Sequence, residues 1–122
     1  MAKTSPKYKR VIIKLSGETL GKKGAEIFDL AALDFVARNV KEAVAAGAAV
    51  GIVGGGGNIV RGATASRLGL ERTVADQMGM LATVINGQAL REALLKAGLS
   101  ARLFSSVEVG PVAEFYHPGR AR

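Results

Sequence analysis

The chain has 122 residues, which is enough for one compact domain and too few for two. It contains no cysteine and a single histidine, His117, so disulfides, thiolate metal ligands and a structural zinc are excluded. The 17 basic and 10 acidic residues leave a net charge of +7, which favours anionic partners, and no apolar run approaches the roughly 18 residues that span a bilayer.

The composition is typical of an α/β protein. Hydrophobic residues make up 48% of the chain but aromatic residues only 5%, which indicates an interior of alanine, valine, isoleucine and leucine. The few aromatic side chains form no cluster on which bases could stack, so nucleic acid is not an expected partner. We predict a single domain over residues 1–122, with a basic tail at 1–7 and a second tail at 117–122, and a cytoplasmic location without membrane contact.

The first expected strand is Val11–Leu15, an apolar run broken only by Lys14 and followed by Ser16 and Gly17. Open α/β sheets bind ligands beyond the carboxyl ends of their strands, so Lys14 is well placed to meet a phosphate. The alternative is a lysine that merely extends from the strand end into water. Residues 18–28 are expected to form a loop, because two glycines and two lysines interrupt the apolar pattern.

A helix is expected over Leu30–Ala46, because leucine and valine recur there at helical spacing between a capping residue, Asp29, and a stop signal, Gly47. A second strand, Ala48–Val53, follows directly. Strand, helix and strand in this order predict one right-handed βαβ unit with parallel strands.

Four consecutive glycines, Gly54–Gly57, follow the second strand and precede Asn58 and Arg61. Glycine leaves backbone N–H groups uncovered, Asn58 can cap a following helix, and the guanidinium of Arg61 fits phosphate oxygens, so the stretch predicts an anion-binding turn. It matches neither a Walker loop, which needs lysine where Ala63 stands, nor a dinucleotide fingerprint, which needs glycine or alanine where Val60 stands. A turn that is merely flexible, and an arginine that merely pairs with a helix, are the alternatives.

A second long helix is expected over Val74–Lys96, opened by Thr73 and Asp76 at capping-box spacing and closed by Gly98. Two stripes of residues run along it at helical spacing. The apolar stripe comprises Val74, Met78, Leu81, Ile85 and Ala89, and the stripe of small or polar residues comprises Asp76, Gly79, Thr83 and Gly87. A glycine inside a helix costs roughly 1 kcal/mol relative to alanine, so the two interior glycines predict the close approach of a ligand or another helix. Asp76 is either the capping carboxylate or a group directed toward sugar hydroxyls. The two faces also predict that this helix makes a subunit contact.

A third strand is expected over residues 101–107. Gly110 and Pro111 then interrupt the chain, and another element begins within residues 112–116. The predicted fold class is therefore α/β, with a mainly parallel sheet.

Three stretches of the chain form motifs, in this order: Tyr-Lys-Arg-Val-Ile-Ile-Lys-Leu-Ser-Gly-Glu at 8–18, Gly-Gly-Gly-Asn-Ile-Val-Arg-Gly at 55–62 and Ala-Asp-Gln-Met-Gly-Met-Leu-Ala-Thr-Val-Ile-Asn-Gly at 75–87. Together they resemble the bacterial UMP kinases, also called uridylate kinases, of the amino-acid kinase family. The resemblance implies the three-layer αβα sandwich of that family in a truncated form, with this chain as its N-terminal, UMP-binding part. Gly54 departs from the family, which has an apolar residue before the three glycines.

The resemblance implies a kinase that transfers the γ-phosphoryl group of ATP to UMP, giving UDP and ADP in pyrimidine nucleotide biosynthesis. It implies ATP with Mg²⁺ as the substrate complex, no tightly bound cofactor, and a homo-oligomer, which is a hexamer in the family. The implied catalytic residues are Lys14 and Arg61, the implied ATP contacts are Lys14, Leu15, Ser16, Gly17, Gly57 and Arg61, and the implied UMP contacts are Gly55, Gly56 and Asp76. Arg91 and Arg102 match arginines of an allosteric GTP site, although Leu95 stands where some members have a histidine.

Members of the family are roughly twice as long as this chain. Their second half carries the adenine pocket and the aspartates that organise phosphoryl transfer, so we expect the chain to be a fragment or a truncated product with weak or no activity of its own. Two other functions stay open: another amino-acid kinase that acts on a carboxylate or carbamate, and a non-catalytic UMP-binding or assembly subunit.

Overall fold

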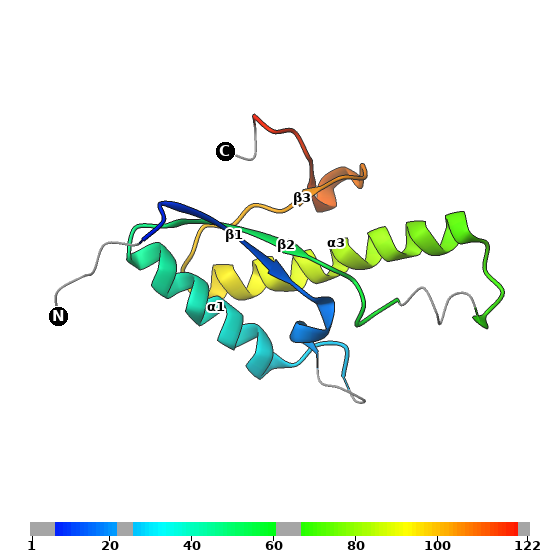
Figure 1. Cartoon of the computed structure of the whole chain (residues 1–122), viewed down its shortest axis with the longest axis horizontal. Coiled ribbons are helices and arrows are strands. Elements are labelled where there is room, and N and C mark those ends of the chain that lie inside the picture. The colour runs from blue at the N-terminus through cyan, green and yellow to red at the C-terminus, as the bar shows by residue number, and fades with distance from the viewer. Residues whose placement is uncertain (1–6, 22–25, 61–66, 120–122) are drawn as a thin grey trace.

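The structure is a computed structural model that describes residues 7–21, 26–60 and 67–119. Its elements, in chain order, are β1 (Arg10–Leu15), the 3₁₀ helix η1 (Gly17–Leu20), α1 (Leu30–Ala45), β2 (Ala49–Gly54), α3 (Arg72–Lys96), β3 (Phe104–Ser105), the 3₁₀ helix η2 (Gly110–Val112) and β4 (Glu114–Phe115). Figure 1 shows β1 and β2 side by side, with α1 below them in the view and β3 above.

β1 and β2 form a parallel pair in which Lys14 lies beside Val53 and Leu15 beside Gly54. Both strands are rich in valine and isoleucine, whose branched side chains suit a pleated surface. The predicted strands over 11–15 and 48–53 are therefore confirmed to within one residue, and so is their parallel pairing. α1 is the crossover between them, as parallel neighbours require.

The hydrophobic core lies on one face of this sheet. Its buried members come from η1, α1 and α3 and comprise Leu20, Val36, Ala37, Val40, Leu90 and Leu94. Half-buried and exposed residues alternate along β1, so the helices cover one face and leave the other open. On the open face the side chain of Ile12 is 78% exposed and that of Val53 is 56% exposed.

The ends of α1 agree with the expected helix over 30–46. Asp29 occupies the N-cap position, but its side chain makes no capping hydrogen bond; its backbone carbonyl accepts from Leu33 N–H at 3.0 Å instead. Gly47 follows the helix with φ 105°, in the left-handed region that glycine adopts without strain. Gly98 ends α3 in the same way, with φ 91°.

Two expectations about α3 were wrong. The helix begins at Arg72, with Glu71 as N-cap, and the proposed capping box fails because Asp76 pairs with Arg72 one turn back, at 3.2 Å. The expected apolar stripe is also not the buried face: Leu81 is 50% exposed and Ile85 44% exposed. The buried residues are Ala82, Val84, Asn86, Leu90 and Leu94, and the elements that contact α3 most among the described residues are α1, β2 and η1.

The expected third strand is shorter than residues 101–107 and does not join β1 and β2 within the described residues. β3 pairs in parallel with β4 as a separate two-stranded sheet, so β4 is the element expected within 112–116. The loop expected over 18–28 is also partly helical, because η1 begins directly after β1. The described residues thus form a mixed α/β structure with parallel strands.

Candidate nucleotide site

The glycine loop, which we define as Gly54–Gly57, lies at the carboxyl end of β1. The N–H of Gly55 donates a hydrogen bond of 3.1 Å to the carbonyl of Leu15, the last residue of that strand. The two segments that the sequence assigned to phosphate binding, 14–17 and 54–57, are therefore brought together by the parallel strand pair. This edge is where open α/β sheets bind their ligands.

Gly17 fits against the glycine loop only because it has no side chain. A Cβ atom at this position would lie 2.6 Å from Oδ1 of Asn58, 2.8 Å from the N of Gly57 and 2.9 Å from the carbonyl oxygen of Gly55. Ser16 directly before it caps η1, because its Oγ accepts from the N–H of Glu18 at 3.4 Å. The turn after β1 therefore packs closely against the turn after β2.

The glycine loop also touches α3. A Cβ atom at Gly56 would lie 2.8 Å from the Cβ of Ala82 and 3.1 Å from the carbonyl oxygen of Gly79. A Cβ atom at Gly79 itself would meet nothing within 4 Å, so the close approach that the interior glycines of α3 predict is not found there among the described residues. At Gly87 it is made by Leu103, whose Cδ1 lies 2.5 Å from the Cβ position, so a ligand or a second helix is not what approaches there.

Asn58 and Asn86 join the loop to α3 by hydrogen bonds. Nδ2 of Asn86 donates to the carbonyl of Gly55 at 2.7 Å and to Oδ1 of Asn58 at 2.6 Å. Nδ2 of Asn58 donates to Oδ1 of Asn86 and to the carbonyl of Ile27, both at 3.0 Å. Asn58 is therefore a bridge between segments, while its predicted role as a helix cap concerns residues 61–66, which lie outside the described residues.

Asn86 is a residue that the sequence reasoning missed. The signal was its place in a series: Ala82, Asn86, Leu90 and Leu94 follow one another at intervals of four residues and share one helix face. An asparagine in an apolar series is a buried polar group that needs partners. This series was overlooked because the stripe that contains Leu81 and Ile85 was predicted to be the buried face of α3.

The remaining predicted site residues fall into three positions. Lys14 is exposed at the end of β1, and the described residues offer it no ion-pair partner. Asp76 lies in the exposed first turns of α3, one turn before Gly79, and pairs with Arg72. Arg61 lies outside the described residues, so its predicted place in the anion-binding turn stays a prediction.

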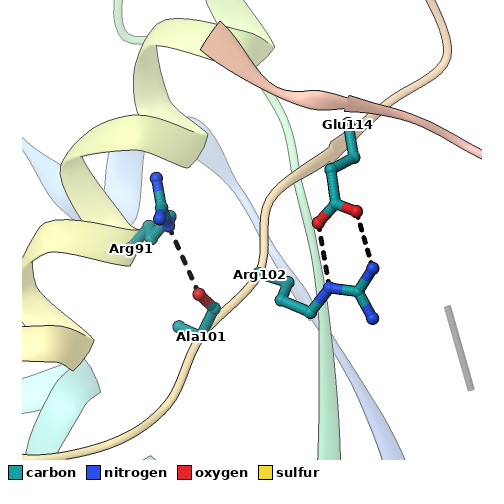
Figure 2. Close-up of polar contacts among 4 residues, drawn as sticks. All are labelled: Arg91, Ala101, Arg102 and Glu114. Atoms are coloured by element: carbon teal, nitrogen blue, oxygen red, sulfur yellow. Dashed lines mark hydrogen bonds and ion pairs between the residues drawn. The ribbon is translucent and has the colours of Figure 1, made fainter. Parts of the chain in front are cut away.

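Arg91 and Arg102 line a separate open pocket of about 460 Å³ between α3 and the β3–β4 sheet. Figure 2 shows Arg102 facing Glu114, with hydrogen bonds of 2.9 Å from Nε and 2.6 Å from Nη2, while Nε of Arg91 donates to the carbonyl of Ala101 at 3.3 Å. The side-chain hydrogen bonds to Glu114 raise the pKa of Arg102 above its usual value. Any anion that binds Arg102 here must compete with this carboxylate.

Two features were not found in the part of the chain that the structure describes. No helix there combines the length and the apolar character needed to cross a bilayer. Nor do three or more histidine, cysteine, aspartate or glutamate side chains gather as a metal ion would require.

The sequence matches a known family of proteins over most of its length. The family model described as "Amino acid kinase family" matches residues 9–121, and the chain belongs to this family.

The chain is similar to several curated uridylate kinases. The chain is 47% identical to the uridylate kinase of Actinobacillus succinogenes over 116 residues, which are 93% of this chain and 48% of that protein. It is 49% identical to the uridylate kinase of Escherichia coli over 113 residues, which are 91% of this chain and 46% of that one. The chain therefore spans about half the length of the curated relatives it matches.

Solved structures agree with this assignment. The crystal structure of UMP kinase from Bacillus anthracis superposes with a TM-score of 0.88 at 40% identity, over 93% of this chain and 47% of that chain. UMP kinase from Ureaplasma parvum gives a TM-score of 0.86 at 32% identity, over 93% of this chain and 48% of that one.

Proposed function

We propose that this chain is the UMP-binding part of a uridylate kinase, an enzyme that transfers the γ-phosphoryl group of ATP to UMP. The observation that carries the proposal is the contact between the turn after β1 and the glycine loop, held by the bond from Gly55 to Leu15. The identity of 47–50% to uridylate kinases supports the same reading, because it extends over nearly all of this chain. Cytoplasmic location and a place in pyrimidine nucleotide synthesis follow from the same proposal.

The proposed roles follow the charge that phosphoryl transfer develops. In this proposal Lys14 and Arg61 stabilise the transferred phosphoryl group. The ATP phosphates contact Leu15, Ser16, Gly17 and Gly57. UMP is to lie against Gly55 and Gly56, with its ribose held by Asp76. The attacking group of UMP is already a phosphate oxygen, so positioning and positive charge supply most of the catalysis and no strong general base is needed.

The ribose role of Asp76 requires a change of partner. Its carboxylate pairs with Arg72, and both side chains are well exposed, at 59% and 90%. Exposed pairs of this kind are worth no more than about 1 kcal/mol, so ribose hydroxyls can replace the guanidinium at little cost.

The complete transfer needs more than these residues. ATP enters with Mg²⁺ as its substrate complex, and the whole enzyme is proposed to complete a three-layer sandwich and to assemble as a homo-oligomer. We propose that this chain alone binds UMP and turns it over weakly or not at all, because loss of positioning alone costs several kcal/mol of barrier and each ~1.4 kcal/mol is a tenfold loss in rate.

Calorimetry and a coupled ADP assay on the purified chain test the proposal together. We expect UMP to bind, AMP to bind much more weakly, and ADP formation to stay near the level of the Lys14→Ala variant. Lys41→Ala, which removes an exposed lysine from α1, is the matched control and should behave as the unchanged chain. A chain that does not bind UMP would refute the assignment, and rapid ADP formation abolished by Lys14→Ala would show that this chain suffices for catalysis.

A further inference from the structure

Asn86 is the largest fully buried side chain among the described residues, with 2% of its surface exposed. It lies in the middle of α3, on the face that packs against the rest of the molecule. A buried amide without partners would cost free energy, and all buried side-chain polar atoms among the described residues have partners. The hydrogen-bond partners of the Asn86 side chain are Gly55, in the glycine loop, and Asn58, directly after it.

The two asparagines form a closed amide pair. Each amide nitrogen donates once to the other side chain's oxygen and once to a backbone carbonyl, that of Gly55 for Asn86 and that of Ile27 for Asn58. A carbonyl can only accept, so each NH₂ group must face its carbonyl, and each oxygen must then face the other NH₂ group. Both amides are thereby held in one orientation.

This arrangement orients one peptide of the glycine loop. Asn86 holds the carbonyl of Gly55 toward α3, and the chain has no cis peptide among the described residues. In a planar trans peptide the C=O and N–H groups point in opposite directions. The N–H of Gly56 is therefore turned away from Asn86, and glycine alone would not enforce this, because it permits many backbone conformations.

We propose that the Asn58–Asn86 pair positions the Gly55–Gly56 peptide so that its N–H can bind the phosphate of UMP. This inference rests on the proposed function, and it makes both asparagines positioning residues, since they act through the backbone of Gly55 and Gly56. Asn58 extends the same restraint to residue 27, so the segment before α1 is tied to the loop as well.

The alternative is that the pair only fills the interior. The two roles differ in what they do to a ligand without phosphate. A positioning role predicts that UMP affinity falls about 5- to 30-fold in Asn86→Ala and Asn58→Ala, while affinity for uridine, which has the same base and sugar, changes less than about twofold. A purely structural role predicts equal losses for both ligands, or none.

The experiment measures UMP and uridine binding to the full chain by NMR titration, with the Gly56 amide as reporter. In the unchanged chain this amide should shift on addition of UMP; in both variants the shift should be lost while the Asp76 amide still responds. The double variant should bind UMP about as weakly as either single variant, because the two side chains act as one unit. Asn39→Ala, which removes an exposed asparagine bonded only within α1, is the control and should bind as the unchanged chain.

The outcomes separate this inference from the function on which it rests. If the unchanged chain does not bind UMP, the proposed function fails and the inference with it. If it binds UMP and the variants keep both the affinity and the Gly56 shift, the positioning role alone is refuted. If Asn86→Ala does not fold, Asn58→Ala decides the question, because Asn58 is only half-buried and its loss removes the two bonds that fix the orientation of the Asn86 amide toward Gly55.

Discussion

Glycine residues, which have no Cβ atom, allow the turns after β1 and β2 to meet at the proposed nucleotide site. A side chain at Gly17 would overlap Asn58 and the backbone of the glycine loop, and a side chain at Gly56 would overlap Ala82 of α3. Neither has a left-handed backbone, so close packing and not turn geometry requires glycine at these positions. Substitutions there should act on stability and on the site together.

Gly17→Ala should lower the free energy of unfolding by about 1–3 kcal/mol, the usual cost of forcing an extra methyl group into packed surroundings. The backbone of Gly55 and Gly57 cannot move aside as a flexible side chain could. Gly54→Ala is the matched control, because nothing lies within 4 Å of its Cβ position, and it should be neutral. Urea unfolding of the two variants checks this, and equal stabilities would contradict the packing seen at Gly17.

Arg61→Ala should weaken UMP binding by roughly 1.5–3 kcal/mol, the scale of a hydrogen bond to a charged group, without altering the melting temperature. Calorimetry with UMP measures the loss, and Arg38→Ala on the exposed side of α1 provides the comparison. If Arg61 only pairs with a helix, its variant would instead melt earlier and retain UMP affinity.

At the scale of the elements, α3 begins without a side-chain cap. Glu71 has the extended backbone of an N-cap, with φ −61° and ψ 147°, but its side chain makes no capping hydrogen bond. Serine at this position has the short hydroxyl that reaches the N–H groups of the first turn. The start of α3 is therefore a place where stability can be gained without touching the glycine loop.

Glu71→Ser should raise the free energy of unfolding by about 0.5–1 kcal/mol relative to Glu71→Ala, which removes the same charge and supplies no cap. Thermal or urea unfolding of both variants measures the difference. Equal stability of the two would mean that the first turn of α3 is not formed in solution.

The elements that could be predicted are those whose signal is local. Alternating and helical spacing of apolar residues placed β1, β2 and α1 to within one or two residues, and Gly47 and Gly98 marked helix ends because of their positive φ. Which face of α3 is buried could not be read in this way, because Leu81 and Ala82 lie on neighbouring faces and only packing selects between them. The β3–β4 pair and the Asn58–Asn86 bridge likewise depend on partners distant in the sequence.

The proposed site shows the same division. The strand-end position of Lys14 and its nearness to the glycine loop followed from parallel topology, which brings carboxyl ends to one edge. What holds that edge together did not follow, because the bonds of Asn86 span 28 and 31 residues. The roles of Lys14, Gly55, Gly56 and Asp76 remain predictions that binding experiments decide.

At the scale of the whole molecule, the described residues leave apolar side chains exposed on the sheet and on α3. The sheet face carries Ile12 and Val53, and the outer side of α3 carries Val74, Met78, Leu81 and Ile85 with 37–50% of each side chain exposed. Apolar residues gathered in this way mark surfaces that another protein segment covers. Since the chain spans about half of its relatives, both a second half of the fold and a second subunit are available occupants.

We expect the outer side of α3 to make the subunit contact. Light scattering at tens of micromolar should then report an oligomer, and Leu81→Glu should shift it toward the monomer, because a carboxylate would be desolvated in the contact. Asn39→Glu places the same charge on exposed α1 and should leave the oligomer intact. A monomeric unchanged chain, or equal behaviour of the two variants, would contradict the contact.

The buried Asn58–Asn86 pair also affects the position of α3 along its own axis relative to the glycine loop. Along the packed face of α3, Asn86 is the polar member of a series whose neighbours one turn away are Ala82 and Leu90. If α3 slid by one turn, an apolar side chain would face the Gly55 carbonyl and the Asn58 amide, and each group left unsatisfied would cost about 1–3 kcal/mol. The close fit of Gly56 against Ala82 opposes the same shift, because a Cβ atom at Gly56 would already lie 2.8 Å from the Cβ of Ala82 and little room is left for a larger side chain. We infer that Asn86 and Ala82 together specify the register of the helix, as a single buried asparagine does in a coiled coil.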